Sequence, residues 1–208
     1  MKTSMKKLAV FVMMAAIAIF IAAATASADD RHHNTIQGEY VWAGCAMGCI
    51  STPDNFHPNG TPINPATLSS SMGVTQGIWT FKHDGTGTVT GTLLSITLPT
   101  APNAGAALVE FSFPYTYTIT DDGAITITAE PNSWMGTFLT GPLSGIPAHL
   151  HLANWGYSGY VSPDRKTITI ARVDPTVVTQ TIPEIGFTTY LICYASHTAL
   201  RLSDEGRE

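Results

Sequence analysis

The sequence predicts an all-β fold, an antiparallel up-and-down meander of about eight strands that closes into a barrel. Apolar residues alternate with a period of two after residue 29, in segments rich in Thr, Ile, Val and aromatics. Asp-Gly and Pro-Asp turns separate these segments, and helical signals are nearly absent. A long meander leaves two exposed edges unless it closes, which favours a barrel. A two-sheet β-sandwich would give the same periodicity and is the alternative.

Residues 1–28 have the layout of a cleaved signal peptide. Three lysines come first, an unbroken apolar run extends from Leu8 to Ala24, and Ala26-Ser27-Ala28 supplies the small side chains of a cleavage site. A membrane anchor is the alternative, because the apolar run is just long enough to span a thin bilayer. The small residues favour cleavage, so we expect an exported protein, periplasmic or extracellular, without a membrane span after processing.

The mature chain, residues 29–208, is expected to form a single domain. Without the leader lysines it has seven Lys and Arg against fifteen Asp and Glu, a net charge of −8. This acidic balance argues against nucleic acid and anionic membrane surfaces as partners. About 180 residues suffice to bury a substantial core.

The clearest strand runs from Val109 to Thr120, where alternate positions from Val109 to Ile119 are apolar or aromatic. Apolar parity slips at Leu93-Leu94, which predicts a β-bulge. The expected strands span about 36–43, 76–83, 86–98, 107–120, 123–130, 135–140, 148–161, 166–173 and 186–202.

Between the first two strands, residues 44–73 carry four prolines and no periodicity. A connection this long in a compact domain is typical of a lid or a binding loop, and a mobile insertion is the alternative.

The early segment from Gly38 to Trp42, the long loop after it and a meander that ends near Arg201 resemble the layout of lipocalin-like (calycin) barrels. Tyr40 stands where that family has its tryptophan, Trp42 lies two residues further on the same face, and the family's Thr-Asp-Tyr signature is missing. Bacterial barrels resembling the allene oxide cyclase fold would give a similar pattern. The resemblance implies that the long loop lies over the open end of the barrel.

Three cysteines, Cys45, Cys49 and Cys193, lie in the mature chain. A closed barrel places the last strand beside the first, which favours a disulfide from Cys45 or Cys49 to Cys193 in an oxidising compartment. A local Cys45–Cys49 bridge is the alternative.

His149 and His151 share one face if they lie on a strand, so both imidazoles could bind one metal ion. A third ligand would have to come from elsewhere, the candidates being His57, His83, His197 and Glu110. Trp155 and Tyr157 have the same parity as the pair. The alternative is that Leu150 and Leu152 point inward and the histidines face solvent.

The chain has no complete catalytic motif, and nothing in it implies a cofactor. We therefore expect a binding protein that holds a small, mostly apolar molecule inside the barrel. A structural or interaction protein with a packed interior is the first alternative, and a small cyclase or isomerase that uses His149 or His151 is the second. The expected ligand-binding residues are Tyr40, Trp42, Trp79, Phe81, Phe111, Phe113, Tyr115, Tyr117 and Trp155.

Overall fold

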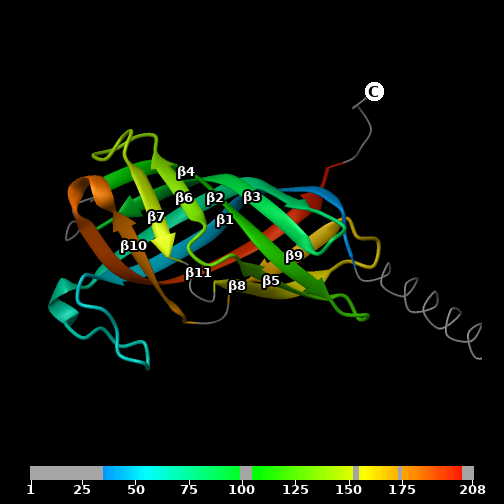
Figure 1. The fold of residues 1–208 in the computed structure, drawn as a ribbon, viewed down its shortest axis with the longest axis horizontal. Coiled ribbons are helices and arrows are strands. Elements are labelled where there is room, and N and C mark those ends of the chain that lie inside the picture. The colour runs from blue at the N-terminus through cyan, green and yellow to red at the C-terminus, as the bar shows by residue number, and fades with distance from the viewer. Residues whose placement is uncertain (1–34, 99–104, 152–154, 173–174, 203–208) are drawn as a thin grey trace, which may run out of the picture. The chain divides into compact units, whose positions relative to one another are not determined.

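The computed structural model describes residues 35–98, 105–151, 155–172 and 175–202. The predicted leader, residues 1–28, lies outside them. The described chain from Ile36 onward forms one compact unit, built almost entirely of strands (Figure 1). Its strands are β1 (Gly38–Thr52), β2 (Ser69–Phe81), β3 (Thr86–Thr97), β4 (Gly105–Ile119), β5 (Ala124–Ala129), β6 (Trp134–Phe138), β7 (Pro147–His151), β8 (Gly156–Val161), β9 (Thr167–Ala171), β10 (Val177–Ile182) and β11 (Phe187–Arg201).

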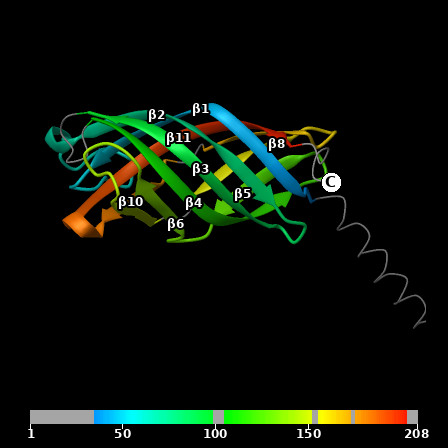
Figure 2. The same cartoon turned by 90° about the horizontal axis from the view of Figure 1, so that it is seen from above.

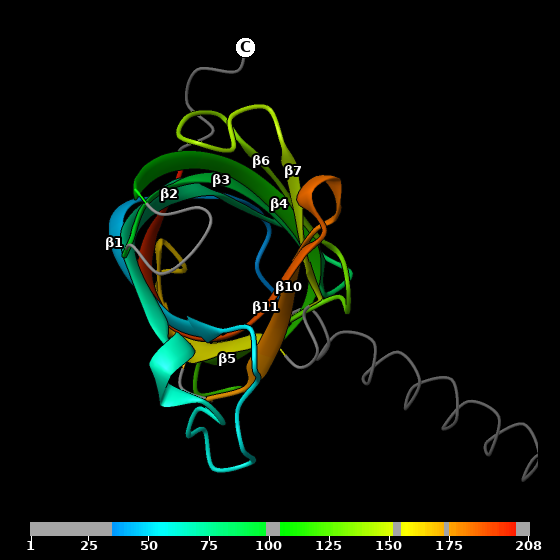
Figure 3. The ribbon, with the colours of Figure 1, turned by 90° about the vertical axis from the view of Figure 1, so that its left-hand side faces the viewer.

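All eleven strands belong to one antiparallel sheet. Hydrogen bonds run around a ring of eight strands, in the order β1-β2-β3-β4-β5-β8-β9-β11, and β11 pairs back onto β1 (Figure 3). The predicted all-β antiparallel fold is therefore confirmed, together with its closure into a ring of about eight strands. Closure pairs the backbone N–H and C=O groups that the two edge strands of an open meander would leave exposed.

The wall of the ring has two tiers between β4 and β11, because each of these long strands changes partner midway. The stretch of β4 from Tyr115 to Ile119 pairs with β5, and the stretch from Val109 to Ser112 pairs with β6. Likewise, one half of β11 pairs with β9 and the other half with β10. One tier consists of β5, β8 and β9, and the other of β6, β7 and β10. The five long strands, β1 to β4 and β11, form the rest of the wall, and each is long enough to run past both tiers (Figure 2).

The strands differ from the sequence prediction in three respects. The expected strand 148–161 is two strands, β7 and β8, which belong to different tiers. Strand β10 was not predicted. The connection between the first two strands spans only 53–68, because β1 continues to Thr52 and β2 begins at Ser69. These extensions are rich in Gly and Ser, so their pairing gives no apolar alternation to detect.

The β-bulge predicted at Leu93-Leu94 is wrong, since β3 pairs with both neighbours without a register shift. Apolar parity slips because the inward positions of β3 become small and polar, at Ser95 and Thr97, while Leu94 and Ile96 turn outward with 46% and 59% of their surface exposed. The register shift lies instead in β1, between Trp42 and Cys45.

Aromatic side chains fill one half of the ring. Tyr40, Phe81, Tyr115 and Tyr117 are buried and pack edge to face, and a Phe81–Tyr115 centroid distance of 5.4 Å is typical of such contacts. The tyrosine hydroxyls donate to backbone carbonyls: Tyr40 donates to Arg165 O at 2.7 Å and Tyr115 to Thr80 O at 3.0 Å. This half of the ring is therefore a packed core in which these tyrosine hydroxyls have hydrogen-bond acceptors.

Candidate ligand-binding cavity

The other half of the ring is hollow, because small residues occupy inward positions on neighbouring strands. Ser71 and Gly73 on β2 pair directly with Thr97 and Ser95 on β3, and Ser69 lies on the same face at the start of β2. Ala107 on β4 and Ala148 on β7 continue the series around the wall. Together they leave a cavity of about 500 Å³, within the range of about 300–1,000 Å³ that is typical of small-molecule sites.

Larger apolar side chains form the remaining walls of the cavity. Five of the nine residues predicted to bind a ligand line it: Trp42, Trp79, Phe111, Phe113 and Trp155. The other four, Tyr40, Phe81, Tyr115 and Tyr117, pack in the solid half.

Several further lining residues were not among those predicted, including Trp134 and Phe138 on β6, Leu150 on β7 and Phe187 on β11. The alternation from Trp134 to Phe138 was a signal that could have identified the first two. All four tryptophans of the chain, Trp42, Trp79, Trp134 and Trp155, therefore line the cavity.

The connection 53–68 contributes Pro53, Ala66 and Thr67 to the cavity lining. Thr67 anchors it, because its hydroxyl donates to Asp54 Oδ2 at 2.7 Å and lies 2.9 Å from Thr52 Oγ1. In Figure 3, which looks into the ring, this connection lies beside the rim. The shortened loop thus borders the cavity at the end where β1 stops and β2 starts.

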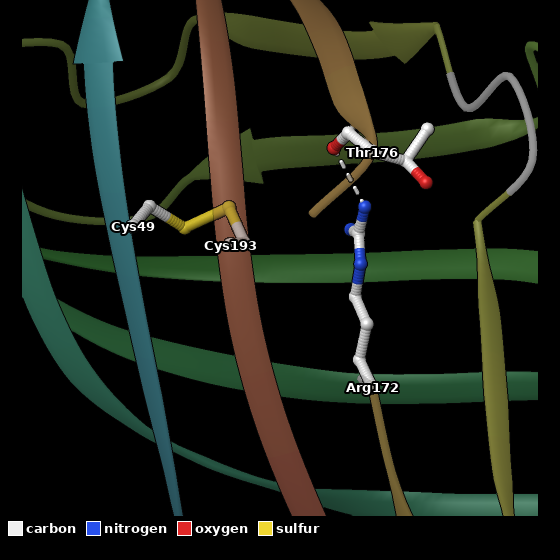
Figure 4. The surroundings of a disulfide bond; sticks show 4 residues. All are labelled: Cys49, Arg172, Thr176 and Cys193. Carbon is white, nitrogen blue, oxygen red and sulfur yellow. Dashed lines mark hydrogen bonds between the residues drawn. A yellow bond between two sulfur atoms is a disulfide. The ribbon is translucent and has the colours of Figure 1, made fainter. Parts of the chain in front are cut away.

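A disulfide joins Cys49 on β1 to Cys193 on β11, at directly paired positions (Figure 4). It closes the seam between the first and last strands, as the sequence favoured, and Cys45 is free. Both bonded cysteines are buried and border the cavity. A buried disulfide fits a protein that folds in an oxidising compartment.

Arg172 connects the two tiers of the wall. It follows β9, and its Nη2 donates to the carbonyl of Thr176, just before β10, at 2.8 Å (Figure 4). Its guanidinium lies 3.8 Å from the ring centroid of Trp155, in a buried cation–π contact. This contact fixes the indole of Trp155 against the cavity.

His197 is the titratable imidazole in the cavity wall. Only 5% of its surface is exposed, and its ring centroid lies 5.2 Å from that of Trp42, 5.3 Å from Tyr157 and 6.0 Å from Trp79. Burial lowers the pKa of His197 to about 4 and raises the pKa of Tyr157 to about 12. Both rings are therefore neutral near pH 7.

Buried polar atoms on the cavity wall lack a hydrogen-bond partner among the described residues. They include Trp79 Nε1, both ring nitrogens of His197 and Ser69 Oγ. Trp42, by contrast, donates its indole N–H to Thr75 Oγ1 at 3.2 Å. Unsatisfied buried groups are uncommon in native proteins. These atoms have almost no accessible surface, so they are enclosed within the wall and do not face the hollow.

The pair His149 and His151 lies on the outer face of β7, since Ala148 and Leu150 point inward. His151 Nδ1 is 3.1 Å from Asn132 Oδ1. Within the described ranges, no group of three His, Cys, Asp or Glu residues gathers around a possible metal ion. His197, a candidate third ligand, lies on the inner side of the wall.

Trp155 and Tyr157 have the same parity as the histidine pair in the sequence, but they do not share its face. Trp155 and Tyr157 point into the cavity, while His149 and His151 point away from it. The reason is that parity carries over only along one continuous strand, and this stretch consists of β7 and β8.

Comparisons with protein-family models, curated proteins and solved structures find no match. They assign the chain to no family, and the resemblance to lipocalin-like barrels stays a prediction from the sequence. The structure itself shows an antiparallel meander with a ring of eight strands. Among the helices of the described residues, none has the length and apolar character needed to cross a membrane.

Proposed function

We propose that this is an exported binding protein that holds one small, mostly apolar molecule in the hollow half of its ring. The observation that carries the proposal is the cavity of about 500 Å³, walled by aromatic and aliphatic side chains. Binding such a molecule buries apolar surface on both sides, the main source of affinity in sites of this kind.

The cavity arises because the inward residues of the same strands change from large to small along their length. Inward positions in the solid half carry rings such as Phe81 and Tyr115, while the same strand faces further along carry Ser71 and Ala107. A structural protein with a packed interior has no need for this change along β2 and β4. The cavity therefore favours a binding role over the structural alternative.

An enzymatic role has less support. His149 and His151, the expected acid–base groups, lie outside the cavity. The lowered pKa of His197 makes its imidazole a weak base at neutral pH. The buried Cys49–Cys193 disulfide supports the proposed export.

Native mass spectrometry tests the proposal, on protein purified after expression of the full chain. We expect a retained small molecule, or stoichiometric uptake of an apolar probe that quenches tryptophan fluorescence. Replacing Ser95 with Phe fills the cavity and should abolish binding, whereas Thr90→Phe, outward on the same strand, should not. Absence of both a retained molecule and probe uptake, or equal binding by the two variants, would contradict the proposal.

A further inference from the structure

In the hollow half of the ring, strands β2 and β3 have small or polar residues inside and large apolar residues outside. Met72 on β2 and Ile96 on β3 point outward, with 68% and 59% of their surface exposed. The inward positions beside them are Ser71, Gly73, Ser95 and Thr97. Strands of a water-soluble sheet bury their apolar side chains, whereas strands whose outer face contacts lipid are apolar outside and polar inside. This stretch of β2 and β3 has the lipid-facing alternation.

The outward side chains form one continuous surface. Met72 pairs directly with Ile96, and the next outward pair is Val74 and Leu94. The ring of Tyr194 on β11 lies over Gly48, the residue of β1 that pairs with Met72. With strands about 4.8 Å apart, this row spans about 14 Å from β11 to β3. We call the surface the outer apolar face, and it consists of Met72, Val74, Leu94, Ile96, Leu98 and Tyr194.

The outer apolar face reaches the rim of the cavity. Thr52, Ser69 and Thr97 are the terminal residues of three strands at this end of the ring, and all three line the cavity. Leu98, which directly follows Thr97, is half exposed and donates its backbone N–H to Ser70 O at 3.0 Å. A molecule that enters or leaves at the rim therefore passes beside the outer apolar face.

Charged residues gather at the opposite end of the ring. The turns 82–85, 120–123 and 162–166, beside the solid half, contain seven of them: Lys82, Asp84, Asp121, Asp122, Asp164, Arg165 and Lys166. The described connections at the rim, 53–68, 139–146 and 183–186, contain Asp54 and Glu184 and no Lys or Arg. Charge is thus distributed unevenly along the ring, and these connections have no cation that would attract anionic lipid.

A lipid surface fits this face better than a second copy of the chain does. The face lies on the outside of a closed ring and is convex, so two copies would touch along a narrow strip. Fluid lipid adapts to a convex surface, and the burial of exposed apolar side chains drives such binding. The uncharged character of the face and the acidic mature chain favour a zwitterionic headgroup over an anionic one.

Resting on the proposed function, we propose that the outer apolar face docks on a zwitterionic lipid bilayer and thereby brings the cavity rim to the membrane. The bound apolar molecule then exchanges directly between the cavity and the lipid, without crossing water. The docking is peripheral, because the apolar side chains of the face enter the interface while the charged end stays in water.

Vesicle flotation tests the docking, with vesicles of phosphatidylcholine alone or mixed with phosphatidylglycerol. We expect the protein to float with pure phosphatidylcholine vesicles at low and high salt alike, and less with the anionic mixture at low salt. The double variant Met72→Gln/Ile96→Thr should bind these vesicles at least about tenfold more weakly, because the interface loses two apolar side chains. The matched control Val41→Thr/Leu200→Gln removes an exposed, directly paired apolar pair near the opposite end and should bind like wild type.

Transfer of pyrene from loaded protein to vesicles tests the direct exchange. The transfer rate should rise with vesicle concentration for wild type and for the control variant, and it should not depend on vesicle concentration for Met72→Gln/Ile96→Thr. The replaced side chains all point outward, so both double variants should keep the wild-type melting temperature and pyrene uptake in solution.

The outcomes separate the two proposals. No flotation of wild type, equal flotation of the two double variants, or flotation only with anionic vesicles overturns the docking and leaves the binding function standing. A dimer in solution that dissociates in Met72→Gln/Ile96→Thr and does not float assigns the face to a second copy, which also overturns the docking. A transfer rate of wild type that is independent of vesicle concentration overturns the direct exchange. Failure of pyrene and other apolar probes to bind in solution overturns the proposed function and the exchange, and flotation then decides the docking alone.

Discussion

Acidification should destabilise this protein through one residue, His197. The pKa of its imidazole is about 4 in the folded protein against 6.5 for an unperturbed histidine, because burial disfavours the charged form. The unfolded chain therefore binds a proton between these values that the folded chain does not. The contribution of His197 to stability is complete above about pH 6.5, falls as the pH drops toward 4, and does not fall further below pH 4. A difference of about 2.5 units corresponds to about 3 kcal/mol.

Guanidinium unfolding followed by tryptophan fluorescence can measure this dependence, on ligand-free protein at pH values from 7.5 to 4. Wild type should lose about 3 kcal/mol more than His197→Phe across this range, because the variant has no proton to gain there. The carboxyls of Asp84, Asp122 and Asp164 affect a lower range, since hydrogen bonds from neighbouring residues hold their pKa values below 3.8. Parallel curves for wild type and variant would refute the reasoning.

Two further predictions concern the fold. Replacing both Cys49 and Cys193 with Ser should lower the free energy of unfolding by up to about 5 kcal/mol, because the disulfide joins residues 144 positions apart in the sequence. Chemical denaturation measures this loss, and an equal loss in a Cys45→Ser variant would contradict the prediction. Replacing Gly87 with Ala should cost about 1–3 kcal/mol, since the added Cβ would overlap both the ring of Tyr115 and the backbone carbonyl oxygen of Thr80. Thermal unfolding measures this, and an unchanged melting temperature would contradict it.

Periodicity was enough to predict most strands and the ring, because each strand has one buried face. It could not predict the two tiers. Strands β4 and β11 keep their alternation while they change partner midway, and alternation carries no information about the partner. The short β10 was missed because Val177–Ile182 has polar residues on both faces.

The site was predictable only in part, for a related reason. Alternation tells which aromatics point inward, and Trp79, Phe111 and Tyr115 all do. An inward aromatic side chain lines the cavity if it lies in the hollow half of the ring of strands, and it packs in the core if it lies in the solid half. The register and closure of the strands decide in which half it lies. His197 occupies an inward position between Ala195 and Ala199, so a polar residue on the apolar face of β11 was the available signal.

The cavity predicts that an apolar molecule stabilises the folded chain. Its walls are largely aromatic and aliphatic, and the site does not exist in the unfolded chain, so a molecule held there binds the folded state alone. An apolar probe should therefore raise the melting temperature with the logarithm of its concentration. The rise should disappear in Ser95→Phe, whose ring fills the cavity, and persist in Thr90→Phe, where the ring points outward on the same strand. An equal rise in both variants would mean that the probe binds outside the cavity.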